Sequence, residues 1–113
     1  MEKENNNTQW QLENTNPELA NLLRKSLRQV IDPELGLDVI ALGLIRDANE
    51  DGEEINVRMI LTTPFCPYGP AMINEVTETA EAAIKRPVIV ELGMEPWDKN
   101  MLEDGIAADW GLF

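Results

Sequence analysis

The stretch EINVRMILT, residues 54–62, contains the clearest strand signal in the chain. Its apolar side chains at positions 55, 57, 59 and 61 alternate along the sequence, so an extended backbone places them on one face. The preceding residues 49–52, NEDG, have the side chains typical of a tight turn. Residues 42–48 are interpreted as another strand, and we therefore expect an antiparallel hairpin of two strands, 42–48 and 54–62.

A helix is expected upstream of this hairpin, from Asn16 to Ile31. Asn16 is a favourable N-cap, and Pro17 suits the first helical position because a missing N–H costs nothing there. The ring of Pro33 disfavours the α conformation at Asp32, so the helix should end near Ile31. Apolar residues recur at helical spacing between these limits, namely Leu19, Leu23, Leu27 and Val30.

The chain beyond the hairpin predicts a loop, a helix, a third strand and a last helix. Two prolines stiffen the loop over residues 62–70. Pro70 is a good first residue for a helix that runs to Lys85 with an apolar stripe along one side. Alternating apolar residues then predict a strand over 88–94, and the last helix is expected over 98–109.

These elements define the expected domain organisation. Their order, α-β-β-α-β-α, predicts a single small domain of the α/β (α+β) class over residues 16–113. Its three-stranded sheet should have helices packed on one face. Residues 1–15 are polar and contain an Asn run, so we expect a flexible N-terminal tail. The alternative is that Trp10 and Leu12 form a short docking motif within that tail.

The composition limits the classes of partner and chemistry. The formal net charge is -12, from 21 acidic and 9 basic side chains, so nucleic acid and anionic membranes would repel the protein. No stretch approaches the ~18 apolar residues of a membrane span, and the N-terminus lacks the features of a secretory signal. One cysteine forms no internal disulfide, which favours the reducing cytoplasm. The absence of histidine excludes a Cys/His nucleophile pair and a histidine-based zinc site.

Cys66 is the first candidate for a functional residue. It lies between Pro64 and Pro67, shortly before the helix expected from Pro70. Free N–H groups at a helix N-terminus favour the thiolate, which is the form that binds metal or attacks electrophiles. The acidic surroundings oppose that effect, so the sequence leaves the direction of any shift open. The alternative is a buried, inert cysteine that fills a small apolar gap.

Asp32 and Glu34 form the second candidate, a pair of carboxylates around Pro33. They can coordinate a metal, transfer protons or meet a basic partner. The alternative is local, with Asp32 capping the turn after Pro33 and Glu34 exposed to solvent. Trp97, which follows the third strand, is interpreted as an aromatic residue of the core or its rim rather than a cofactor stacker.

Four segments in a fixed order resemble the iron–sulfur cluster assembly domain family that includes the SufT and PaaD proteins. They are DPELGLD at 32–38, LGLI at 42–45, LTTPFCP at 61–67 and PWDKN at 96–100. The resemblance spans roughly residues 17–112 and implies a role in the maturation of iron–sulfur proteins. It also implies site residues, with the family's reactive cysteine at Cys66, its loop threonine at Thr62 and its acidic pair at Asp32 and Glu34.

Two functional hypotheses follow from these residues and the resemblance. The leading one is an iron–sulfur cluster assembly or transfer factor in which Cys66 binds iron or a cluster transiently. Common clusters have about four protein ligands, so a homodimer, a small thiol or a partner must supply the others. The alternative is an adaptor that docks the assembly machinery to target apoproteins without touching metal. The expected partners are iron–sulfur assembly proteins and target apoproteins, and the lack of histidine or a second cysteine speaks against a turnover enzyme.

Overall fold

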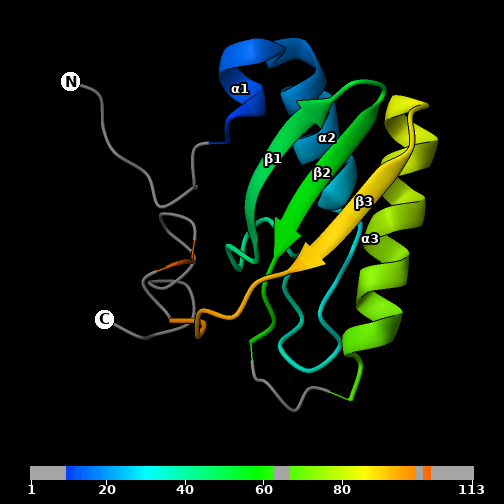
Figure 1. The fold of residues 1–113 in the computed structure, drawn as a ribbon. Helices are drawn as coiled ribbons and strands as arrows, with labels where there is room; N and C mark the ends of the chain where they lie inside the picture. Colours follow the sequence, from blue (N-terminus) through cyan, green and yellow to red (C-terminus); the bar gives the residue numbers. More distant parts are fainter. Residues whose placement is uncertain (1–9, 63–66, 99–100, 103–113) are drawn as a thin grey trace.

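A computed structural model describes residues 10–62, 67–98 and 101–102 of the chain. The elements follow one another as α1 (Leu12–Thr15), α2 (Pro17–Leu27), β1 (Ile45–Asp51), β2 (Glu54–Met59), α3 (Gly69–Ile84) and β3 (Val88–Leu92). The strands form a three-stranded sheet in the order β1-β2-β3. Figure 1 shows α2 and α3 on one face of this sheet, as predicted. Across these ranges, no helix is long and apolar enough to cross a membrane.

The central strand β2 pairs on both sides. It is antiparallel to β1, with Ala48 opposite Val57, and parallel to β3, with Val57 opposite Val90. The predicted hairpin is therefore confirmed, and β2, α3 and β3 form a βαβ unit. The side chains of Ile55, Val57 and Met59 have no exposed surface, which confirms the alternation that predicted this strand.

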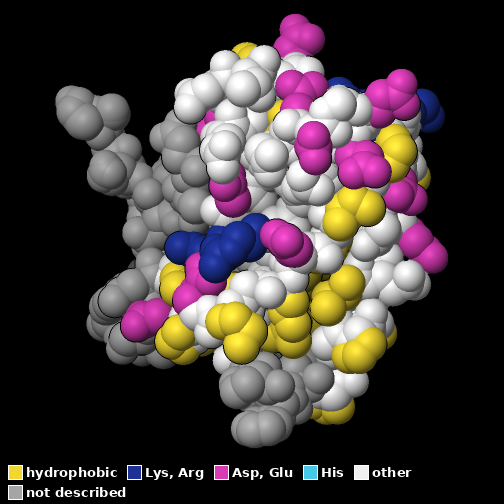
Figure 2. Space-filling view, in the orientation of Figure 1, with side chains coloured by type: hydrophobic (Ala, Val, Ile, Leu, Met, Phe, Trp, Pro, Cys, Tyr) yellow, Lys and Arg dark blue, Asp and Glu magenta, His cyan; other side chains and the backbone are white. Residues whose placement is uncertain are grey.

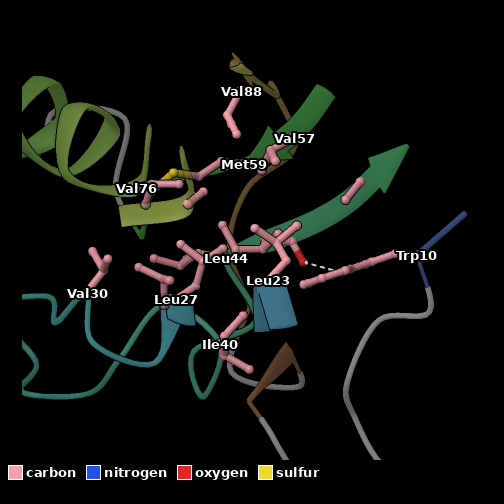
Figure 3. Packing of buried hydrophobic residues seen from close by; sticks show 14 of the residues in the cluster. Trp10, Leu23, Leu27, Val30, Ile40, Leu44, Val57, Met59, Val76 and Val88 are labelled. Atoms are coloured by element: carbon pink, nitrogen blue, oxygen red, sulfur yellow. Dashed lines mark hydrogen bonds between the residues drawn. The ribbon is translucent and has the colours of Figure 1, made fainter. Parts of the chain in front are cut away.

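The hydrophobic core fills the space between the sheet and the helices (Figure 3). In that view Leu23 and Leu27 of α2 and Val76 of α3 lie across from Val57 and Met59. Burying such a side chain stabilises the fold by roughly 1.5–3 kcal/mol. The apolar stripes along α2 and α3 are thus what hold the two helices against β2.

The start of α2 follows the prediction, whereas its end does not. The Asn16 side chain accepts a hydrogen bond from the Leu19 N–H at 3.2 Å, and Pro17 occupies the first turn. The helix ends at Leu27 rather than Ile31, because the N–H groups that follow bond three residues back instead of four. The N–H of Val30 bonds to the Leu27 carbonyl at 3.1 Å.

The N-terminal segment corrects the predicted boundary of the domain. Residues 10–15 are not a tail: Trp10 and Leu12 are 1% and 0% exposed and belong to the core. The Trp10 indole N–H donates to the Ile45 carbonyl at 3.3 Å, and the Arg24 guanidinium lies 4.0 Å from the ring centroid. The polar composition misled because two large apolar side chains are enough to anchor a short segment. Residues 1–9 lie outside the described residues.

The first strand also differs from its prediction, since β1 covers Ile45–Asp51 instead of 42–48. The residues before it are held in turns, because the Asp38 carboxylate accepts hydrogen bonds from the N–H groups of Ile40 and Ala41 at 2.9 and 2.8 Å. Gly43 continues these turns with a φ of 73°. The last helix predicted over 98–109 lies mostly outside the described residues.

Trp10→Ala tests the anchoring of the N-terminal segment. Removing this buried ring should lower the free energy of unfolding by ~3 kcal/mol or more, the usual cost of emptying such a site. Leu22→Ala is the matched control, because Leu22 is 43% exposed and its truncation should cost far less. Urea denaturation measures both. Equal, small effects of the two variants would contradict the burial of Trp10.

Two glycines with the same backbone conformation provide a further test. Gly36 and Gly43 have φ values of 75° and 73°, but an added Cβ is free of contacts at Gly36 and overlaps the Met101 carbonyl at Gly43. Gly36→Ala should therefore cost only the ~1–2 kcal/mol of the left-handed conformation. Gly43→Ala should cost a further ~1–3 kcal/mol because the backbone of Met101 must move. Similar melting temperatures for the two variants would show that this contact is unimportant.

Candidate functional site

The parallel strands β2 and β3 have their carboxyl ends at the same end of the sheet, which is where open α/β sheets usually bind their ligands. A groove of about 350 Å³ lies there. One wall follows β2 and the other follows β3. The residues that line the groove are Leu61, Thr62, Leu92, Gly93, Met94, Glu95, Pro96 and Trp97.

Thr62 is the predicted site residue that the structure places in this groove. It lies in the connection from β2 to α3, and Cys66 belongs to the same connection in the sequence. Cys66 itself lies outside the described residues. Pro67 and Tyr68, which follow it in the chain, are exposed. The cysteine therefore lies, in sequence, between the groove residue Thr62 and the start of α3.

The N-terminus of α3 has the properties that the thiolate argument requires. Tyr68 is the N-cap residue, and its side chain makes no capping hydrogen bond. The first turn contains Pro70 and no acidic residue. The positive end of the helix dipole is therefore not neutralised by a carboxylate in that turn.

Asp32 has the capping role that the sequence offered as the alternative. The residue is 1% exposed, and its Oδ1 accepts hydrogen bonds from the N–H groups of Glu34 and Leu35 at 2.8 and 3.1 Å. The Asp32 carbonyl also accepts from the Gly36 N–H at 2.8 Å. These bonds fix the bend around Pro33. A metal or proton-transfer role for Asp32 has no support in these contacts and stays a prediction.

The Glu34 side chain projects from the same bend into solvent and makes no hydrogen bond or ion pair with the residues that the structure describes. Figure 1 shows the loop of residues 31–38, in cyan, at the end of the molecule where β2 and β3 finish and α3 begins. The structure thus brings the acidic loop and Thr62 to one end. That the two carboxylates lie near Cys66 stays a prediction. Within the described ranges, no group of three or more Cys, Asp and Glu side chains could hold a metal ion.

The wall that follows β3 was largely missed by the sequence analysis. Trp97 is half-buried, packs against the core and donates its indole N–H to the Leu42 carbonyl at 2.8 Å. This agrees with a rim aromatic. Leu92 and Met94 remain 48% and 91% exposed beside it. The available signal was an apolar pattern that ends the strand at Leu92 and continues past it at Met94, with Pro96 closing the segment.

An ion pair fastens this wall to the sheet. The Glu95 carboxylate accepts hydrogen bonds from both Nη groups of Arg58, and the one from Nη1 to Oε2 is 2.9 Å long. Arg46 Nε lies 3.9 Å from the same carboxylate. The hydrogen bonds from Arg58 lower the pKa of Glu95, and burial opposes that effect. The same bonds raise the pKa of Arg58. An added Cβ at Gly93 would lie 2.8 Å from Glu95 Oε1 and 3.1 Å from the Arg58 guanidinium, so the ends of these two side chains would have to shift.

Comparison with known proteins agrees with this fold and with the family resemblance. The family model described as "Iron-sulfur cluster assembly protein" matches residues 22–92, from within α2 to the end of β3. The chain therefore belongs to the iron–sulfur cluster assembly protein family, and the resemblance stated from the sequence is confirmed.

Several relatives are similar over most of their length. The chain is 42% identical over 77 residues to the Fe-S protein maturation auxiliary factor SufT of Staphylococcus aureus. The alignment covers 65% of this chain and 86% of that protein. The auxiliary factor YitW of Bacillus subtilis is also 42% identical, over 68% of this chain and 78% of its own. A DUF59 domain from Bacillus anthracis superposes with a TM-score of 0.78 at 25% identity, covering 88% of this chain and 97% of that one.

Glu95→Gln tests the ion pair through its pH dependence. Because Arg58 lowers the pKa of Glu95, the ionised carboxylate stabilises the fold above the ordinary value of 4.5, and this contribution is lost as the pH falls through the folded-state pKa. The variant should therefore be less stable than wild type at neutral pH, with the difference vanishing in acid. Glu75→Gln, at an exposed position of α3, is the control. Melting curves across pH measure both, and a constant difference would rule out the assigned coupling.

Proposed function

We propose that this chain is a maturation factor for iron–sulfur proteins, which receives or passes iron or a cluster at Cys66. The observation that carries the proposal is the position of Cys66 in the connection from β2 to α3. That connection contains the groove residue Thr62 and ends at a helix whose first turn has no acidic residue. Such surroundings favour a reactive thiolate. The names of SufT and YitW as maturation auxiliary factors support the same process.

The available ligands favour transient binding of a cluster over permanent binding. The chain has one cysteine and no histidine, whereas common clusters have about four ligands, usually thiolates. A second chain, a small thiol or the target apoprotein must therefore supply the other ligands. A shell that is completed from outside is readily exchanged, which suits a factor that hands its cargo on. The reducing cytoplasm, where the thiol stays reduced, is the compartment that we propose.

The other site residues have distinct proposed roles. Thr62 lines the groove and offers a hydroxyl to the cargo or to the incoming ligand. The Glu34 carboxylate, exposed and without a partner among the described residues, is suited to accept or return a proton as the thiolate binds and releases iron. Asp32 acts indirectly, because its hydrogen bonds to Glu34 and Leu35 hold the bend that presents Glu34.

An adaptor function is the second candidate, and the groove is the observation that favours it. Its walls are largely apolar, and Leu92 and Met94 beside it are exposed. Exposed apolar side chains around a groove are typical of a surface that binds another protein. In this version the domain brings assembly proteins and apoproteins together, and Cys66 has no metal.

Cys66→Ser separates the two functions. Serine is similar in size to cysteine but is a poor ligand for iron. Under anaerobic reconstitution with iron and sulfide, the wild-type protein should develop visible charge-transfer absorbance, and the variant should lose at least ~90% of it if the thiolate is the required ligand. Thr62→Val, which removes the groove hydroxyl that we assign to the cargo, is the companion variant and should lower the absorbance less than Cys66→Ser, because the thiolate is still present.

The same variants should be tested in cells for maturation of an iron–sulfur enzyme. We expect Cys66→Ser to fold with a near-normal melting temperature and to fail to support maturation. A stable Cys66→Ser protein with full cellular activity would contradict the proposal and favour the adaptor.

A further inference from the structure

The two edges of the sheet are covered differently. On the β1 side, the N-terminal segment packs against the strand: the Trp10 indole donates to the Ile45 carbonyl at 3.3 Å, and the Gln11 N–H donates to Asp47 Oδ1 at 2.9 Å. On the β3 side, the Val88 N–H donates to the Glu81 carboxylate at 2.9 Å, and no other outward backbone group of β3 bonds to a described residue outside the sheet. The strand β3 therefore ends the sheet with little cover from the described chain.

The register identifies which backbone groups of β3 face outward. The ladder to β2 is flanked by a bond from the Ile55 N–H to the Pro87 carbonyl at 2.9 Å and one from the Gly93 N–H to the Met59 carbonyl at 2.7 Å. Since alternate residues of a strand bond to the same neighbour, Val88, Val90 and Leu92 present their N–H and C=O groups away from β2. The bond between Val88 and Glu81 agrees with this assignment.

Val90 and Leu92 thus have outward backbone groups that no other described residue satisfies. Proteins usually blunt such an edge with lysine, proline or a bulge. The sequence of β3, VIVEL, contains neither lysine nor proline, and its pairing with β2 is regular. The edge is therefore a ready template for another strand.

The side chains around this edge indicate the chemistry of the partner. Ile89, Leu92 and Met94 are 46%, 48% and 91% exposed, and the groove opens where the strand ends. Figure 2 shows hydrophobic side chains gathered over the lower part of this face, with acidic side chains around them. Glu81 and Glu91 on either side of the edge are exposed, and the whole chain has a net charge of -12. Apolar and basic side chains complement such a surface.

We propose that an extended segment of a partner polypeptide, with alternating apolar and basic side chains, adds to the sheet as a strand beside β3. Its backbone bonds to Val90 and Leu92. Its apolar side chains lie on one face, where one of them enters the groove, and its basic side chains lie on the other face, toward Glu91. A second copy of this chain is disfavoured as the partner, because two chains of charge -12 repel each other. The strand pairing itself does not depend on the proposed function. Only the identity of the partner does: we take it to be an assembly protein or an apoprotein that is brought beside Cys66.

Amide hydrogen exchange measured by NMR tests the pairing directly. The probe is a capped synthetic peptide of alternating lysine and valine residues at ~1 mM, a concentration that detects weak binding. In the free protein the Val90 and Leu92 amides should exchange much faster than those of Ile89 and Glu91. With the peptide, exchange at Val90 and Leu92 should slow by at least about tenfold. Unchanged exchange at these two amides would overturn the proposal.

Control peptides and one variant make the result specific. A peptide with proline in place of valine keeps the charge but cannot form a strand, and one with glutamate in place of lysine reverses the charge. Neither should protect Val90 or Leu92, and equal protection by either would refute the assigned chemistry. Val90→Pro removes the outward N–H at an edge position that tolerates proline, and should abolish binding. Protection that rises with protein concentration alone would identify a second copy as the partner and overturn the proposal.

The outcome can be separated from that of the proposed function. Cys66→Ser should bind the peptide as wild type does, and Val90→Pro should retain charge-transfer absorbance after reconstitution. Loss of peptide protection with absorbance retained would count against the docking edge alone. Loss of absorbance in the wild-type protein with protection retained would count against the cluster function alone.

Discussion

The structure depends on the position of β2 between two strands of opposite direction. Its inward side chains Ile55, Val57 and Met59 are fully buried, so the strand cannot shift by one residue without turning its apolar face to solvent. The antiparallel neighbour needs only a short turn, but the parallel neighbour needs a crossover. That crossover is α3, and its packing against the sheet is what closes the core.

The location of the candidate site follows from this constraint. Two parallel strands have their carboxyl ends at the same end of the sheet. The residues after β2 and after β3 are therefore brought together there, although the sequence separates them by about thirty positions. Thr62 and Trp97 line one groove for this reason. The Arg58–Glu95 ion pair and the indole bond of Trp97 to Leu42 then hold the wall after β3 in place. The same arrangement leaves β3 as the open edge of the sheet.

Much of the fold was predictable from local patterns, because the alternation in 54–62 and the capped start at Asn16 are signals that act within a few residues. The errors come from contacts over long sequence distances. Trp10 is buried through its contacts with β1 and Arg24, which composition does not reveal. The groove wall from Leu92 to Trp97 depends on the parallel pairing of β3, which the strand pattern alone does not specify. Cys66, Asp32 and Glu34 were selected from their local sequence and Thr62 from the family resemblance. Of these residues the structure describes the capping bonds of Asp32, the exposure of Glu34 and the groove position of Thr62.

Paramagnetic NMR of the iron-loaded protein tests most directly whether the cargo binds at the carboxyl ends of the parallel strands. In a ¹⁵N-labelled sample reconstituted anaerobically, bound iron broadens the amide signals nearest to it. Broadening is expected at Thr62, Tyr68 and Glu34, with the signal of Gly52 in the β1–β2 turn unaffected. Broadening centred instead on the acidic residues of that turn, Glu50 to Glu54, would show adventitious iron at the opposite end of the sheet and would contradict the account.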